Sequence, residues 1–140
     1  MADWNTIRDY IYENKSLVLA TVDKAGNPQI RHIGGYTIED KDILFQTVAD
    51  SNKVKEIENN DHVSLLFQHE GQTVPKNITV YGNAVLLNAE EAGKASERIR
   101  IRRPQIQYDP QKNVIFRVRI HSVKILDFAA EKKTVILNEI

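Results

Sequence analysis

The segment Ala20–Lys53 decides the fold, and it reads ATVDKAGNPQIRHIGGYTIEDKDILFQTVADSNK. Its first residues end a β-rich run over residues 16–22, which the turn-forming residues 23–28 separate from a second run over residues 29–36. A third run over residues 43–48 leads directly into a helix. Short strands joined by tight turns are typical of antiparallel sheets and not of regular parallel α/β folds.

The rest of the chain continues this pattern, with further strands expected over residues 62–68, 77–87, 114–121, 123–128 and 134–137. Helices are expected after the N-cap residues Asp3, Ser51 and Asn88, the last one running from Ala89 to about Arg103. About six or seven antiparallel strands with two or three helices predict a mainly β protein, a closed or split β-barrel, in one domain over residues 1–140. The alternation predicts these core residues: Leu17, Leu19, Ile43, Phe45, Val63, Leu65, Val80, Phe116 and Val118.

The composition is that of a soluble globular protein, with 41% hydrophobic and 27% charged residues. Nineteen basic residues balance nineteen acidic ones, so no global field favours nucleic acid or an anionic membrane. Cysteine is absent, which excludes disulfides, zinc–thiolate sites and a thiol nucleophile. With no secretory or membrane-spanning apolar run, we expect a cytoplasmic protein.

Several conspicuous residues carry weaker signals. Gly34–Gly35 lacks the rest of a dinucleotide-binding motif and indicates either a barrel corner or the close approach of a ligand. The strand histidines have no carboxylates at metal-binding spacing, so no metal site is predicted. The arginines of residues 98–103 complement the negative end of a helix better than they fit a nucleic-acid surface, because no aromatic residues are interleaved with them.

Arg31 is the first candidate for ligand binding. In an extended strand its side chain shares a face with Gln29 and Ile33, so it is half-buried if Ile33 packs into the core. A desolvated guanidinium needs an anionic partner, and no acid stands out on the neighbouring strands. The sequence therefore indicates a ligand anion beside Arg31.

The helix that follows the third strand provides a second part of this anion site. Thr47 ends the strand, and Ser51 and Lys53 begin a helix whose N-terminus carries about half a positive charge. Two hydroxyls, an ammonium group and free N–H groups can together bind a phosphate. A capped helix with a solvated lysine would have the same sequence, so both interpretations stay open here.

The order of these elements resembles the pyridoxamine 5'-phosphate oxidase-like family of FMN-binding split barrels, especially its general-stress-protein branch. Four motifs carry the resemblance, which covers roughly residues 16–87: Gly26-Asn27-Pro28 ahead of Arg31, Phe45-Gln46-Thr47, Ser51-Asn52-Lys53, and the strand Lys76–Gly82. It implies a split barrel of the FMN-binding type, FMN as the cofactor, and a homodimer with the flavin at the subunit interface.

The resemblance also implies nine cofactor-binding residues. Those that hold the FMN phosphate are Arg31, Ser51 and Lys53. Those whose backbone lines the isoalloxazine and ribityl groups, together with Arg31, are His32, Ile33, Phe45, Gln46 and Thr47. The last residue, Asn77, stands near the flavin and is expected to come from the second subunit.

The chain departs from the family pattern at several positions. Asn52 replaces an arginine and Asn77 replaces a glutamine, so weaker phosphate or flavin contacts are expected. The Trp, Arg and His that bind pyridoxal phosphate in the true oxidase have no counterparts, so pyridoxamine-phosphate oxidase activity is not expected. No catalytic acid or base is assigned, and hydride transfer to a flavin does not require one.

Three functions are compatible with these residues. The leading hypothesis is an FMN-dependent oxidoreductase of a small-molecule substrate, with NAD(P)H as a candidate electron donor. The second is a non-catalytic, stress-associated flavin-binding protein, and the sequence does not separate these two. The third keeps the fold but binds a deazaflavin or haem, and it is the weakest, because the helix start suits a terminal phosphate and no histidine is placed as a haem ligand.

Overall fold

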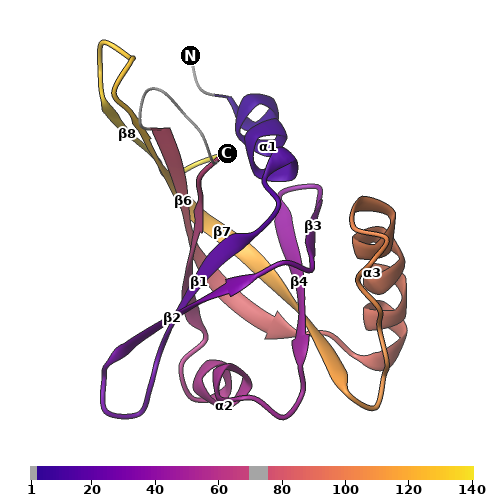
Figure 1. Ribbon diagram of the computed structural model, residues 1–140. Helices are drawn as coiled ribbons and strands as arrows, with labels where there is room; N and C mark the ends of the chain where they lie inside the picture. Colours follow the sequence, from indigo (N-terminus) through magenta and orange to yellow (C-terminus); the bar gives the residue numbers. More distant parts are fainter. Residues whose placement is uncertain (1–2, 70–75) are drawn as a thin grey trace.

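A computed structural model describes residues 3–69 and 76–140, and its described residues form eight strands and three helices (Figure 1). The elements in chain order are α1 Trp4–Glu13, β1 Leu17–Val22, β2 Pro28–Ile33, β3 Tyr36–Glu39, β4 Asp42–Val48, α2 Asn52–Asn59, β5 His62–Phe67, β6 Lys76–Leu86, α3 Ala89–Arg102, β7 Asn113–Asp127 and β8 Thr134–Leu137. The predicted loop through Gly71 and Pro75 lies outside the described residues. None of the described helices is long and apolar enough to cross a membrane.

The strands form one antiparallel sheet in the order β2-β1-β5-β6-β7-β4-β3, with β8 added beside β7. Its two edge strands, β2 and β3, are consecutive in the chain and are joined by Gly34–Gly35. The sheet therefore curls until β2 and β3 lie near each other. The short link between these two strands closes the sheet, whereas a full barrel would be closed by hydrogen bonds between them. This is the predicted split β-barrel, and Gly34–Gly35 forms its corner.

The main core fills the curled sheet and is covered at its two ends by helices. Ile7 and Ile11 of α1 reach it from one end, and Val54 and Ile57 of α2 reach it from the other (Figure 1). All nine predicted core residues are buried in this cluster, so that prediction is confirmed. A second, smaller core lies outside the barrel, where α3 packs on β4 and β7 through Leu44, Ala92, Ala95, Ile99 and Ile115.

Strand β7 differs from the expectation of two separate strands over residues 114–121 and 123–128. It is a single strand of 15 residues with a bulge, because Tyr81 pairs with Ser122 while Gly82 pairs with Ile120. The extra residue, His121, shifts the inward-facing positions from even to odd numbers, so that Val123 follows Val118 into the core. The break in alternation that suggested two strands is this bulge.

Strand β3 was also missed, because residues 29–36 were expected to form one strand. The chain instead leaves β2 at Ile33, and Tyr36 begins β3, paired with Phe45. A Cβ at Gly35 would lie 3.2 Å from Cγ2 of Ile106, so the corner is also tightly packed.

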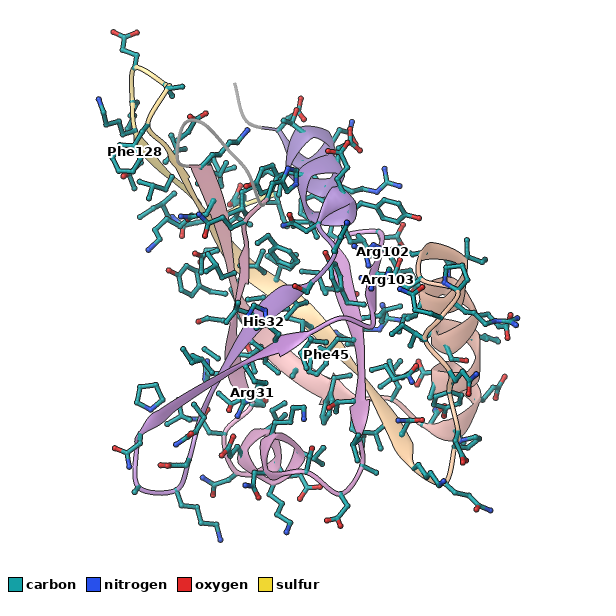
Figure 2. The ribbon with its side chains drawn as sticks, viewed as in Figure 1. Arg31, His32, Phe45, Arg102, Arg103 and Phe128 are labelled. Atoms are coloured by element: carbon teal, nitrogen blue, oxygen red, sulfur yellow. The ribbon has the colours of Figure 1, made fainter. Side chains whose placement is uncertain are left out.

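The arginines of α3 have specific partners. The Arg102 guanidinium lies 4.0 Å from the ring centroid of Tyr36 and donates to the Tyr36 hydroxyl at 2.9 Å and to the carbonyl of Tyr12 at 3.0 Å. Arg103 donates to the carbonyl of Lys15, and Figure 2 shows both arginines between α1 and α3. Burial raises the pKa of Tyr36 well above its usual range, so the phenol stays neutral. These arginines join α3 to the rest of the fold.

Two glycines in different settings test the tight packing at the β7 bulge. A Cβ at Gly82 would lie 2.3 Å from the carbonyl oxygen of Arg119, whereas a Cβ at Gly93 in α3 would meet no heavy atom within 4 Å. Gly82→Ala is therefore expected to lower the free energy of unfolding by about 1–3 kcal/mol or more. Gly93→Ala is expected to raise it by about 0.5–1 kcal/mol. Denaturant unfolding measures both, and a Gly82→Ala protein as stable as the unmodified chain would show that the bulge is loosely packed.

Candidate functional site

Arg31 lies on the inner face of β2, near the end of the barrel that α2 covers (Figure 2). It pairs directly with Leu19, which is fully buried, and directly paired residues of antiparallel strands point to the same face. Its side chain is 23% exposed. The sequence-based expectation of a half-buried arginine on the core side is therefore confirmed.

Arg31 has an acidic partner within the protein. Its Nη2 donates to Oε1 of Glu56 at 2.9 Å, and its Nη1 donates to Oγ1 of Thr21 at 2.7 Å. The Thr21 hydroxyl in turn donates to Oε1 of Glu56 at 2.7 Å. No acid on a neighbouring strand pairs with Arg31, but Glu56 of α2 does, so the need for an anionic partner does not by itself require a ligand anion.

Lys53 lies one helical turn before Glu56 on α2 and is half-buried. Burial lowers the pKa of Lys53, the charge of Arg31 lowers it further, and Glu56 raises it. The two cations and the carboxylate therefore act on one another, and we call Thr21, Arg31, Lys53 and Glu56 the Arg31 cluster. Sequence reasoning missed Thr21 and Glu56, although the spacing of three between Lys53 and Glu56 was a usable signal.

The first turn of α2 is free of the usual side-chain cap. Ser51 occupies the N-cap position, but its hydroxyl donates backward to the carbonyl of Val48 at 2.8 Å and makes no cap hydrogen bond. The first turn also contains no acidic residue. The N–H groups at this helix start can therefore donate to a ligand anion.

The predicted residues of β4 divide between the two faces of the strand. Phe45 is fully buried in the barrel and stacks on Phe116, with ring centroids 5.3 Å apart, so its side chain contributes packing. Thr47 is buried two residues further on, at the end of the strand. Strand β3 pairs with β4 only as far as Phe45, after which the amide of Gln46 donates to the carbonyl of Gly35 at 2.8 Å. Beyond that bond, β4 lies across from β2 with α2 below both (Figure 1).

Gln46 points to the opposite face from Phe45, toward the segment that follows α3. Its Nε2 donates to the carbonyl of Gln107 at 2.7 Å, so it ties this segment to β4. Its Oε1 is buried and has no hydrogen-bond partner among the described residues. An unpaired buried acceptor costs about 1–3 kcal/mol, so this oxygen is a candidate to accept a hydrogen bond from a ligand.

The remaining predicted residues lie apart from the Arg31 cluster. The His32 side chain is exposed on the outer face of β2, and Ile33 is buried in the core opposite Leu17. Asn77 lies on β6, which β1 and β5 separate from β2, and it alternates with the buried Ile78. The structure thus brings Arg31, Lys53 and the start of α2 together and leaves Asn77 elsewhere in this chain. The expected contact of Asn77 with a flavin of the second subunit stays a prediction.

Comparisons with known proteins show the family of this chain. A family model described as pyridoxamine 5'-phosphate oxidase matches residues 4–127. The pyridoxine/pyridoxamine 5'-phosphate oxidase of Escherichia coli O9:H4 (strain HS) is 37% identical over 79 residues, which are 56% of this chain and 35% of that protein. The match thus spans about a third of the length of this curated relative.

Two solved structures have the same fold at low sequence identity. General Stress Protein 26 from Bacillus anthracis str. Sterne has a TM-score of 0.72 and 20% identity, with 96% of this chain and 97% of that chain covered. A structure named F420 Reductase has a TM-score of 0.69 and 17% identity, with 83% and 94% covered. Because the family model matches most of the chain, this chain belongs to the pyridoxamine 5'-phosphate oxidase family.

Proposed function

We propose that this chain binds FMN at the Arg31 cluster and acts as an FMN-dependent oxidoreductase on a small molecule. The observation that carries the proposal is the ion pair of Arg31 with Glu56 of α2, which brings Arg31 to the helix whose uncapped first turn holds Lys53. Phosphate esters are bound by this combination of a guanidinium fork, an ammonium group and helix N–H groups. Membership of a family named for a phosphate-ester oxidase supports the same reading.

The residues present fit a flavin with a terminal phosphate. The Nε of Arg31 has no partner among the described residues, so it remains available to a phosphate oxygen. A bound flavin would supply the redox chemistry, and the protein would hold it and limit its contact with water.

Two alternatives remain. A non-catalytic flavin-binding protein would use the same residues, since none of them is needed as an acid or base. A deazaflavin is the other candidate ligand, favoured by the fold shared with the structure named F420 Reductase. Pyridoxamine-phosphate oxidation is not proposed, because the match covers 35% of the curated relative and the substrate-binding Trp, Arg and His of the true oxidase have no counterparts.

An absorbance spectrum of the purified protein tests the proposal. Bands like those of free FMN, with FMN identified by mass spectrometry after heat release, are the expected result. Bleaching of these bands by NADH or NADPH without oxygen would favour an enzyme over a storage or sensor protein. A protein that is purified without flavin and does not bind added FMN would contradict the proposal.

Arg31→Ala is expected to weaken FMN binding by about tenfold to more than a hundredfold, because charge-assisted hydrogen bonds contribute about 1.5–3 kcal/mol each. Lys53→Ala is expected to have a milder effect, since a flexible ammonium group acts as a point charge and not as a fork. Fluorescence titration of the ligand-free proteins measures both affinities.

Riboflavin, which lacks the phosphate, is the control ligand. It should bind the unmodified protein poorly and lose little further affinity in Arg31→Ala. Because Arg31 also pairs with Glu56, thermal unfolding of each variant must be measured alongside. Equal losses for FMN and riboflavin would mean that Arg31 supports the fold and not the phosphate.

We also propose a homodimer, formed through the outer face of β1, β2, β5 and β6. Two rows of directly paired residues cross this face, one through Ile30, Ala20, Ser64 and Tyr81 and the other through His32, Val18, Leu66 and Thr79. Their side chains are half-buried or exposed in the single chain, and α3 packs on a different part of the sheet. A sheet face with small and apolar side chains is stabilised by a second layer, which an identical subunit can provide.

Light scattering at micromolar concentration should therefore give about twice the chain mass of 16.0 kDa. Leu66→Arg, in the middle of the face, is expected to give a monomer, because it places a desolvated charge in the interface. Ile101→Arg is the matched control, since Ile101 is 77% exposed on α3. A monomer with FMN fully bound, or a dimer that tolerates Leu66→Arg, would contradict this arrangement.

A further inference from the structure

The partners of Arg31 occupy one edge of its guanidinium. Oγ1 of Thr21 and Oε1 of Glu56 lie 2.7 Å apart, and each accepts from a different terminal nitrogen, Nη1 and Nη2. Because these two oxygens are so close together and bind different terminal nitrogens, both lie along the edge of the guanidinium between Nη1 and Nη2. Nη1 also makes longer contacts with the carbonyls of Leu19 and Gln29, at 3.4 and 3.3 Å.

The other edge of the guanidinium is available. Nε and the second hydrogen of Nη2 have no partner among the described residues. These two donors form the side edge of the fork, which matches two oxygens of a phosphate. The protein therefore uses one edge of the Arg31 guanidinium to hold the side chain in place. The other edge, which suits an oxyanion, remains available to a ligand.

The groups that hold Arg31 are themselves well fixed. Thr21 is 1% exposed, and the Glu56 side chain is 14% exposed. The Thr21 hydroxyl donates to Glu56, so its lone pairs are directed toward Nη1. An arginine held in this way loses little further conformational freedom when it binds a ligand.

The charge of Glu56 acts in the opposite direction. It lies within the same cluster as Arg31 and Lys53, and it would repel a phosphate dianion placed beside them. Glu56 thus has two effects on a phosphate ligand that can be separated. Its oxygen positions Arg31, and its negative charge reduces the attraction of the site.

We propose that Glu56 is a positioning residue for phosphate binding, which together with Thr21 directs the Nε/Nη2 edge of Arg31 toward the ligand. Its charge holds the affinity for a phosphate dianion below the value that the two cations alone would give. The inference rests on the proposed FMN site and extends it by two residues, Thr21 and Glu56.

Two substitutions at Glu56 separate position from charge. Glu56→Gln keeps an oxygen that accepts from both Arg31 and Thr21 but removes the charge, so FMN should bind about three- to tenfold more tightly. Glu56→Ala removes the oxygen as well, so FMN should bind at least about tenfold more weakly than to Glu56→Gln. Riboflavin affinity should be the same in both variants, because the effect is on the phosphate.

The measurement is fluorescence titration of the ligand-free proteins with FMN and with riboflavin, at low and high salt. Glu58→Gln is the matched control, an exposed glutamate of the same helix, and it should change neither affinity. The gain in Glu56→Gln should shrink at high salt, because it is electrostatic. If Glu56→Ala unfolds, Thr21→Val tests the positioning separately: it keeps the shape of the buried side chain, removes the hydroxyl, and should weaken FMN binding alone.

The outcomes separate this inference from the proposed function. An unmodified protein that binds FMN no more tightly than riboflavin would overturn both. A clear preference for FMN that is unchanged in Glu56→Gln, Glu56→Ala and Thr21→Val would overturn the inference and leave the FMN site standing. Equal changes in FMN affinity for Glu56→Gln and Glu56→Ala would remove the positioning role.

Discussion

The covalent link between the two edge strands is the constraint on which the rest of the structure depends. Because β2 and β3 are separated only by Gly34–Gly35, the sheet must curl until its edges meet. The curl leaves a split below the corner, because β3 begins opposite Phe45 and β4 continues past that point to Val48. Helix α2 follows β4 directly and covers that end of the core with Val54 and Ile57. The candidate site lies at this end of the barrel, where β2 meets α2.

The same geometry explains why Arg31 needs Glu56. Because Arg31 pairs with the fully buried Leu19, its side chain points toward the barrel interior, where an unpaired charge is destabilising. Glu56 meets this need from within the protein, so a carboxylate compensates the charge of Arg31. The ion pair therefore compensates the Arg31 charge, and in the proposed site it also positions the guanidinium for an anion. This dual role distinguishes it from the more exposed pair of Arg100 with Glu97 on α3.

Much of the fold could be predicted from alternation alone, because inward residues of a half-buried strand recur every second position. The nine core residues were found in this way. Alternation failed where geometry interrupts the period, at the bulge around His121 and at the corner that separates Ile33 from Tyr36. A break in the alternation looks the same in sequence whether the strand ends, bulges or turns a corner. The sequence alone therefore could not show that β7 is one continuous strand.

The candidate site could be predicted in part for a similar reason. Arg31, Ser51 and Lys53 are visible because they stand in order along one segment. Glu56 was missed because its contact with β2 depends on how α2 sits against the barrel, which the strand pattern does not record. Gln46 was expected near a ligand through its backbone, and its side-chain bond to Gln107 depends on the packing of the segment after α3. A residue pattern within one helix or strand cannot predict contacts with an element that is distant in the sequence.

The departures from the family pattern make geometry more important in this chain. Asn52 stands where the family resemblance implies an arginine, so the start of α2 has one cation fewer than expected. Glu56 adds a negative charge to the same cluster. In the proposed site, less net charge would attract a phosphate, so binding would depend more on directed donors, namely the free edge of Arg31 and the uncapped N–H groups of α2. Directed donors contribute only when they are held in place, and in this chain Thr21 and Glu56 are the residues that hold Arg31.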